Sequence, residues 1–217
     1  ANPAMAAAVE QAPVTVVADA GECSFQFDPI GRNKFDGTSC DIVKAYLARS
    51  GVNYSNADAA PGTVASVQIG EEVHRAPDPA TLTGEAKASA IAAFQQELHA
   101  ALTRAGYPPA ADPAQVNKVK VIAILCIFGL LATMVYGPLA ALLVELFPAR
   151  IRYSSLSLPY HIGNGWIGGF MPTIGFAMVA ATGNIYQGLW YAVAFAAITA
   201  VVGILFLPET YKRDIEA

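Results

Sequence analysis

One stretch of the sequence restricts the fold more than any other. From Val121 to Leu207 the only acid is Glu145, and the only bases are Arg150, Arg152 and His161. A soluble helix must present a polar face to water, and this stretch has too few polar residues for that. We therefore predict that the chain is an α-helical membrane protein.

Three spans fit into this stretch, because each needs about 20 residues to cross the hydrocarbon core. Asp112 and Pro113 are suited to start the first helix, as N-cap and first helical residue. We expect a membrane region over 113–208 and a tail over 209–217, with spans at about 119–147, 155–181 and 188–207.

The polar region before the spans, residues 1–112, is predicted to form a small α+β unit, here called the N-terminal module. Alternating and β-branched runs predict strands, and apolar stripes predict helices. Ser39 is the expected N-cap of the first of these helices, and Gly51 its C′ residue. The predicted strands are 14–17, 24–27 and 63–69, and the predicted helices are 39–50 and 85–104.

The cysteines divide into a candidate pair and a single residue. Cys23 and Cys40 flank a turn-rich loop, and a disulfide between them would stabilise the module by roughly 3 kcal/mol. Such a bond requires an oxidising compartment. The alternative is two free thiols in a cytosolic loop. Cys126 lies in an apolar run, where we expect a small buried side chain.

The positive charges predict the orientation of the spans. The loop after the first span carries Arg150 and Arg152, the tail carries two more basic residues, and the 182–187 turn carries none. Short loops rich in Lys and Arg face the cytoplasm. The module is then extracytoplasmic, in agreement with the disulfide. Lys118 and Lys120 lie on the other side, but they end a long loop, where the rule is weak.

The second span contains more than an anchor needs. Gly165 and Gly169 have the small-xxx-small spacing that lets helices approach closely, so we predict that they pack against other helices. Three spans are too few to surround this one. Since the chain also begins with Ala1 and shows no signal peptide, we interpret it as a piece of a longer protein.

Polar residues inside the spans are candidates for a transport site. His161 could carry a proton, and Asn164 lies near it on the same face. The alternative is a structural histidine bonded to a neighbouring helix. Tyr136 precedes Gly137 and Pro138 at the middle of the first span, where a kink suits a ligand site or serves packing alone.

Three segments resemble the major facilitator superfamily of transporters. Residues 145–152 read ELFPARIR and match the E-x-F-P-x-x-x-R signature that closes the tenth helix of many members. Residues 157–166 read SLPYHIGNGW, similar to the eleventh helix of the metabolite:proton symporters. Residues 207–210 read LPET and resemble the Pro-Glu-Thr ending after the twelfth helix.

The resemblance implies that the spans are helices ten to twelve of a twelve-helix fold, with helices one to nine absent from the chain. It implies a proton-coupled symporter of small organic solutes in the inner or plasma membrane, working by alternating access. Tyr136 would line its cavity. Glu145, Arg150 and Arg152 would belong to a cytoplasmic charge network that latches the inner gate, although a helix-end charge reaching water is the alternative for Glu145.

The sequence leaves two functions as alternatives to transport. An anchored extracytoplasmic binding or interaction module would explain the long N-terminal region, but not the gate motif. An enzyme is not expected, because the module holds no metal, nucleophile or phosphate-binding motif. His74 and His99 are interpreted as surface residues. We expect no cofactor and no metal, and the net charge of −4 disfavours nucleic acid as a partner.

Overall fold

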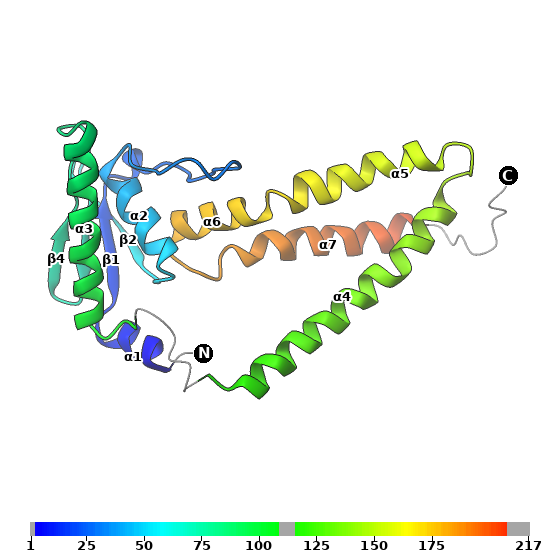
Figure 1. Ribbon diagram of the computed structural model, residues 1–217, viewed down its shortest axis with the longest axis horizontal. Helices are drawn as coiled ribbons and strands as arrows, with labels where there is room; N and C mark the ends of the chain where they lie inside the picture. Colours follow the sequence, from blue (N-terminus) through cyan, green and yellow to red (C-terminus); the bar gives the residue numbers. More distant parts are fainter. Residues whose placement is uncertain (1–2, 109–115, 208–217) are drawn as a thin grey trace. The chain divides into compact units, whose positions relative to one another are not determined.

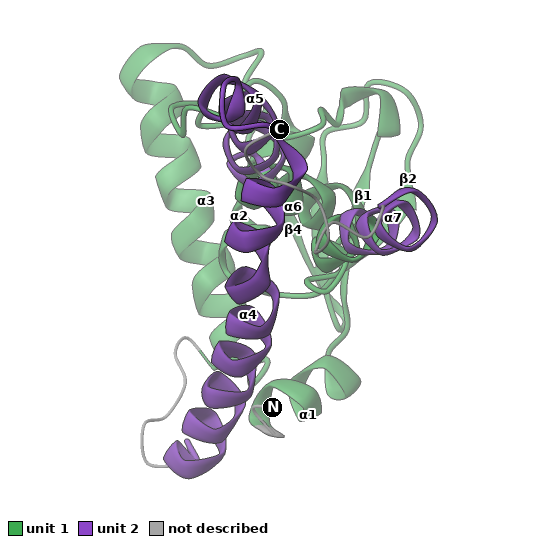
Figure 2. Cartoon of the chain, turned by 90° about the vertical axis from the view of Figure 1, so that its right-hand side faces the viewer, with its two compact units in different colours: residues 1–110, 171–194 green, residues 111–170, 195–217 purple. Residues whose placement is uncertain are grey.

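The computed structural model describes residues 3–108 and 116–207, and these fall into two compact units. The first unit holds residues 1–110 together with 171–194, and the second holds 111–170 together with 195–217. Figure 2 colours the two units separately. The N-terminal module thus shares a compact unit with part of the second predicted span, which the predicted domain boundary near residue 112 did not anticipate.

The module is built on a four-stranded sheet in the order β2-β1-β3-β4 (Figure 1). β1 pairs in parallel with β2 and antiparallel with β3, which in turn pairs antiparallel with β4. The parallel pair requires a crossover, and α2 provides it. The elements in chain order are α1 (Pro3–Gln11), β1 (Val14–Ala18), the 3-10 helix η1 (Ala20–Glu22), α2 (Ser39–Arg49), β2 (Ser55–Asp58), β3 (Ser66–Ile69), β4 (Glu72–Arg75) and α3 (Gly84–Arg104).

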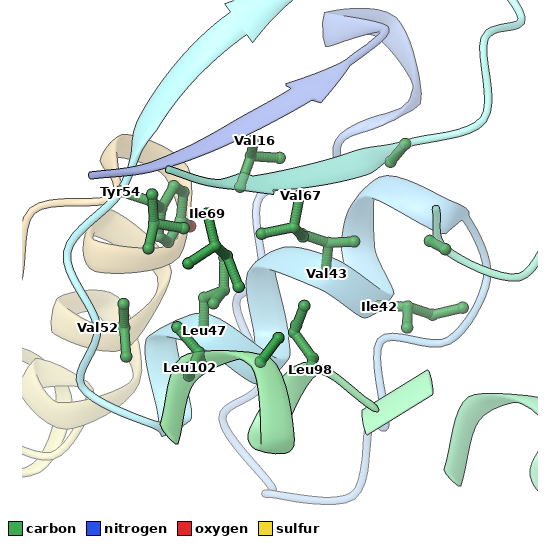
Figure 3. Packing of buried hydrophobic residues seen from close by; sticks show 14 of the residues in the cluster. Val16, Ile42, Val43, Leu47, Val52, Tyr54, Val67, Ile69, Leu98 and Leu102 are labelled. Carbon is green, nitrogen blue, oxygen red and sulfur yellow. The ribbon is translucent and has the colours of Figure 1, made fainter. Parts of the chain in front are cut away.

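The core of the module forms where α2 and α3 cover the sheet, as Figure 3 shows. Val16 and Val67 are neighbours across the β1–β3 pair and are almost wholly buried. Leu47 of α2 and Leu98 of α3 have no exposed surface. Burying side chains of this size contributes about 1.5–3 kcal/mol each, which makes this contact the main support of the fold.

Both long helices of the module end in the same way. After α2, Gly51 has φ +67°, and the amide of Val52 donates to the carbonyl of Leu47 at 3.1 Å. After α3, Gly106 has φ +87°, and the amide of Tyr107 donates to the carbonyl of Leu102 at 2.9 Å. These are Schellman endings, which need a residue that tolerates positive φ.

Several predictions for the module were wrong in detail. Residues 24–27 do not form a strand, because the Ser24 amide and the Gln26 side chain donate to Asp41 at 2.9 Å instead of to a neighbouring strand. Ser39 lies inside α2, and Thr38 is the N-cap, accepting from the Asp41 amide at 3.1 Å. The elements α1, β2 and β4 were not predicted.

The Thr38→Ala variant is expected to lower the free energy of unfolding of the module by about 1 kcal/mol, the usual cost of losing an N-cap. The Thr38 hydroxyl also donates to the Glu22 carbonyl at 2.7 Å, so both bonds are lost together. Amide hydrogen exchange of α2 in the full chain measures the change.

Thr83→Ala is the matched control, since Thr83 is the N-cap of α3 but makes no capping hydrogen bond. This control is expected to stay within about 0.5 kcal/mol of the unsubstituted protein. Equal effects of the two substitutions would contradict the role given to Thr38.

Among the residues that the structure describes, three helical stretches are long and apolar enough to cross a membrane, as predicted. The second is continuous in helical character but changes type, from α5 (Arg152–Tyr160) through the π-helix η2 (His161–Gly168) to α6 (Met171–Thr182). The helix of the first span begins at Lys118, with Asn117 as its N-cap, so the predicted start at Asp112 and Pro113 was wrong. Asp112 and Pro113 themselves, the LPET segment from Pro208 onward and the 209–217 tail lie outside the described residues. The three stretches are α4 (Lys118–Leu146, 29 residues), Arg152–Thr182 (31 residues) and α7 (Leu189–Phe206, 18 residues).

The surfaces of α4 and α7 are apolar and exposed. No residue of α4 or α7 is buried within the described part of the chain. Cys126 is exposed on α4, so the prediction of a buried side chain was wrong. Apolar surface of this extent requires lipid tails or further helices to cover it.

Candidate functional site

The predicted gate residues lie where α4 ends and α5 begins. Glu145 is in the last turn of α4, Arg150 is exposed in the connecting turn, and Arg152 is the first residue of α5. The Nε of Arg152 donates to the carbonyl of Phe147, the C-cap of α4, at 3.2 Å. A cation on the last carbonyls of a helix stabilises the negative end of its dipole, so Arg152 ties the two helix ends together.

His161 marks the point at which α5 changes into the π-helix. Its Nδ1 lies 2.6 Å from the carbonyl of Ser157 and 3.3 Å from the Ser157 hydroxyl. The partner of Nδ1 is therefore in the preceding turn of the same helix. The alternative role, a structural bond from His161 to a neighbouring helix of a larger protein, remains a prediction. Asn164 lies in the same π-helix. Short π-helical segments are frequent at functional sites, because they turn side chains away from the regular helical positions.

The two predicted packing glycines lie on either side of the end of the π-helix. A Cβ at Gly165 would meet nothing within 4 Å, whereas one at Gly169 would collide with the carbonyl oxygen of Gly165. Gly169 is thus required by the local backbone of the described residues. The prediction that the pair also contacts another helix of a larger protein remains a prediction.

Tyr136 lies on α4, which continues through Pro138 without interruption. The side chain is 61% exposed, and it comes from a different helix than His161 and Asn164. The structure therefore brings His161 and Asn164 together on η2, and Glu145 and Arg152 to adjoining helix ends. It shows no contact between Tyr136 and either pair among the described residues.

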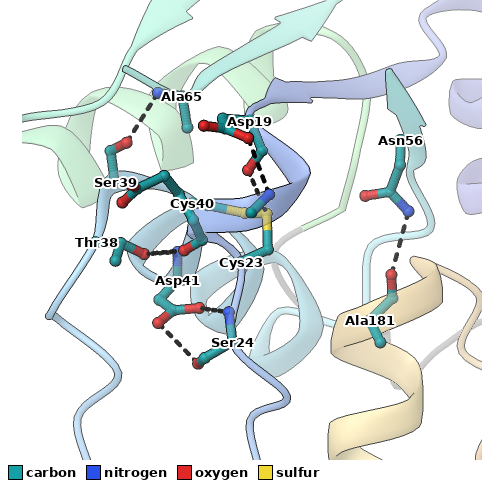
Figure 4. The surroundings of a disulfide bond; sticks show 12 residues. Asp19, Cys23, Ser24, Thr38, Ser39, Cys40, Asp41, Asn56, Ala65 and Ala181 are labelled. Carbon is teal, nitrogen blue, oxygen red and sulfur yellow. Dashed lines mark hydrogen bonds between the residues drawn. A yellow bond between two sulfur atoms is a disulfide. The ribbon is translucent and has the colours of Figure 1, made fainter. Parts of the chain in front are cut away.

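Cys23 and Cys40 are joined by a disulfide (Figure 4). It ties the segment after η1 to the first turn of α2. Asp41 lies beside it and accepts from the Ser24 hydroxyl at 2.8 Å. At the other end of η1, backbone amides of Gly62 and Gly21 hold the pKa of the Asp19 carboxyl below its usual value. Disulfide and carboxylates together fix the loop between β1 and α2.

His74 corrects one prediction from the sequence. It is buried, not on the surface, and its Nδ1 lies 2.7 Å from a carboxylate oxygen of Glu97. Its Nε2 lies 3.4 Å from Glu72, which also binds Arg104 at 3.0 Å. This cluster connects β4 to α3 and explains why a polar residue occupies the inner face of a strand. His99 is exposed, as expected.

A further set of polar contacts, in which the module meets the end of α6, was not predicted from the sequence. Asn53, Tyr54 and Asn56, around the start of β2, bond to residues 180–185. Burial raises the pKa of the Tyr54 hydroxyl, so this group stays protonated at neutral pH and can donate a hydrogen bond. Only the turn glycine at 183 could have drawn attention to this place. In the residues that the structure describes, no group of three or more potential metal ligands occurs.

Known proteins similar to this chain are transporters. The family described as sugar (and other) transporter matches residues 82–217, more than half of the chain. A glycine betaine/proline/ectoine/pipecolic acid transporter of Dickeya dadantii is 34% identical over 80 residues. A citrate-proton symporter of Klebsiella pneumoniae is 33% identical over 82 residues, and a putative metabolite transport protein of Haemophilus influenzae is 33% identical over 97 residues.

Each match covers only part of this chain and only part of the relative. They cover 37%, 37% and 45% of this chain, and 16%, 17% and 22% of the respective relatives. The chain thus corresponds to about a fifth of the length of the curated relatives it matches. No solved structure is a significant match to the chain.

Proposed function

Since the chain belongs to the sugar (and other) transporter family of the major facilitator superfamily, we propose that it is the C-terminal part of a secondary active transporter for a small organic solute. The resemblance of the motifs to this superfamily is thereby confirmed, and the similar proteins are transporters, not enzymes. The observation that carries the proposal is the family match over all three membrane-capable helices.

The proposed mechanism is proton symport by alternating access. Its support is the activity named for one relative, a citrate-proton symporter, together with ionisable and polar residues inside the spans. His161 is the proposed proton-carrying residue, with Asn164 beside it on η2. Tyr136 is the proposed cavity-lining residue of α4, two residues before Pro138. A proline inside a helix removes the bond to the carbonyl four residues earlier and leaves that carbonyl free for a ligand.

The proposed latch lies at the cytoplasmic ends of α4 and α5. Arg152 holds the C-cap carbonyl of α4, and Glu145 and Arg150 supply charges within the same short region. Charge-assisted hydrogen bonds of this type are strong, yet they break and re-form when helix ends rock apart. The proposed topology places this region inside the cell and the N-terminal module outside, in the inner or plasma membrane.

Solute uptake tests the proposal. The full gene product that contains this chain is reconstituted into proteoliposomes, and labelled citrate, glycine betaine and proline are offered with and without an inward proton gradient. We expect at least one solute to accumulate, and a protonophore to abolish the accumulation. Uptake that does not respond to the proton gradient would contradict proton symport. Absence of uptake for all of the offered solutes, which are solutes of the relatives, would contradict transport.

The Arg152→Ala variant is expected to reduce the uptake rate about tenfold. A hydrogen bond from a charged group contributes about 1.5–3 kcal/mol, and a tenfold change corresponds to the lower value. Arg152→Lys keeps the charge but loses the planar donor, so an intermediate rate is expected. If Arg152→Ala transports like the unsubstituted protein at equal expression, Arg152 is not part of a latch.

A further inference from the structure

At the C-terminal end of α6, the backbone of the helix supplies hydrogen-bond donors for only some of the last carbonyls. The amide of Gly183 donates to the carbonyl of Val179 at 2.7 Å, and Gly183 has φ +78°. This is the single-bond ending in which the C′ residue is left-handed. It leaves the carbonyls of residues 180–182 without a partner in the helix, and such groups require donors from elsewhere.

The N-terminal module supplies those donors. The Tyr54 hydroxyl donates to the carbonyl of Ala180, and the Tyr54 amide donates to that of Gly183 at 3.0 Å. The Asn56 side chain lies 3.3 Å from the carbonyls of both Ala181 and Thr182, as Figure 4 shows for the first of them. Four successive carbonyls at the end of α6 are thus satisfied by two residues of the module.

Donors on the α6 side also form hydrogen bonds to the module. The amide of Ile185, in the turn after α6, donates to the side-chain oxygen of Asn53 at 2.9 Å. In the first turn of α6, the hydroxyl of Thr173 accepts a bond at 3.0 Å from the amide of Asp28 in the module. Both partners therefore contribute donors and acceptors, which specifies one orientation of the module on the helix.

Close backbone packing accompanies these bonds. A Cβ at Gly183 would collide with the carbonyl oxygen of Tyr54, so only glycine fits there. Ala177 and Ala180 of α6 are almost fully buried. Gly188, the residue before α7, also packs closely against α6. A Cβ at Gly188 would lie only 2.8 Å from the carbonyl oxygen of Gly175.

We propose that residues 53–56 form an intramolecular docking surface for the end of α6, so that the module, α6 and the 183–188 turn move as one rigid body during transport. The inference rests on the proposed transport function. The span that contains α6 is 31 residues long, whereas about 20 cross the hydrocarbon core. The last turns of α6 can therefore project from the bilayer and be held by an extracytoplasmic module.

Separation of the two surfaces would leave four carbonyls and two backbone amides, those of Tyr54 and Ile185, without these partners at once. Buried or interfacial backbone groups rarely stay unpaired. A pivot of α6 against the module would therefore be opposed at each of these four carbonyls. Movement of the whole body costs none of these bonds, which favours rocking of the module together with its helix.

Chemical cross-linking tests the docking surface. In the full gene product carrying Cys126→Ser, Asn56→Cys and Thr182→Cys are joined by a short, cleavable bifunctional thiol reagent. Val73→Cys with Thr182→Cys is the control, because β4 lies three strands from β2, roughly 14 Å at about 4.8 Å per strand. We expect at least tenfold more cross-linking for the first pair. Equal yields would overturn the docking surface.

Transport by the cross-linked protein tests the rigid body. We expect uptake within twofold of the same variant without the reagent, because the proposed surfaces never part. A greater loss that is restored when the cross-link is cleaved would overturn the proposal. If the variant without the reagent shows no uptake and neither does the unsubstituted protein, the transport function fails, while the cross-linking yield still decides the docking surface.

Discussion

Replacing Gly183 with alanine is expected to weaken the docking of the module on α6 by roughly 2–5 kcal/mol. The left-handed backbone at φ +78° costs a non-glycine residue about 1–2 kcal/mol. The new Cβ would also collide with the carbonyl oxygen of Tyr54, so the Tyr54 amide loses its bond to Gly183. A lost backbone bond of this kind costs a further 1–3 kcal/mol or so.

Amide hydrogen exchange in the full gene product measures this effect at the amides of Tyr54 and Ile185. Both should exchange at least about 30-fold faster in Gly183→Ala, since every 1.4 kcal/mol corresponds to a factor of ten. Gly51→Ala is the matched control, with φ +67° and nothing within 4 Å of its added Cβ. It should destabilise the end of α2 and leave both amides unchanged. Unchanged exchange in Gly183→Ala would contradict the contact.

Removing the disulfide is expected to lower the free energy of unfolding of the module by about 3 kcal/mol, because the bond closes a loop with a sequence separation of 17. Cys40 has no exposed surface, so alanine is the suitable replacement and avoids a buried hydroxyl. Urea unfolding of the Cys23→Ala/Cys40→Ala variant, followed by hydrogen exchange of β1 and α2, gives the change in free energy.

Cys126→Ala is the control, and it should leave the free energy of the module unchanged, because Cys126 lies on α4 outside the module. Alkylation before and after reduction checks the redox state in cells. One reactive thiol before reduction and three afterwards are expected, since the remaining two are paired. Three reactive thiols without reductant would contradict both the disulfide and the oxidising compartment that it requires.

The membrane helices were the part best predicted from the sequence. The first predicted span, 119–147, corresponds to α4 at Lys118–Leu146, and the third, 188–207, to α7 at Leu189–Phe206. Hydropathy succeeds here because the bilayer demands a long apolar run whatever the rest of the protein does. The change of α5 into a π-helix at His161 was not predicted, since no local pattern distinguishes it from a regular helix.

The ends of α2 and α3 in the module were also predictable, because a local residue pattern determines them. Gly51 and Gly106 follow the last apolar residues of α2 and α3, and both adopt positive φ. β2 was missed because its sequence, Ser-Asn-Ala-Asp, lacks the apolar alternation of a strand. Pairing with β1 across the α2 crossover makes it a strand, and a pairing between distant segments leaves no local signal.

The contacts at the end of α6 could not have been predicted either, because they too join segments that are far apart in the sequence. Asn56 and Ala181 are 125 residues apart, and neither asparagine nor tyrosine in a loop indicates its partner. The gate residues and polar span residues, by contrast, were recognisable from motifs, and the structure places them at helix ends and at the π-helix. Their roles in transport remain predictions.

The central claim is that the helices cross the membrane with the N-terminal module outside and the Arg150 turn inside. Labelling with a membrane-impermeant maleimide tests it most directly, using Glu71→Cys and Arg150→Cys singly in the full gene product with Cys126→Ser. Both positions are exposed. In intact cells we predict labelling of Glu71→Cys alone, and labelling of Arg150→Cys only after the membrane is opened. Labelling of Arg150→Cys in intact cells, with Glu71→Cys protected, would contradict the account.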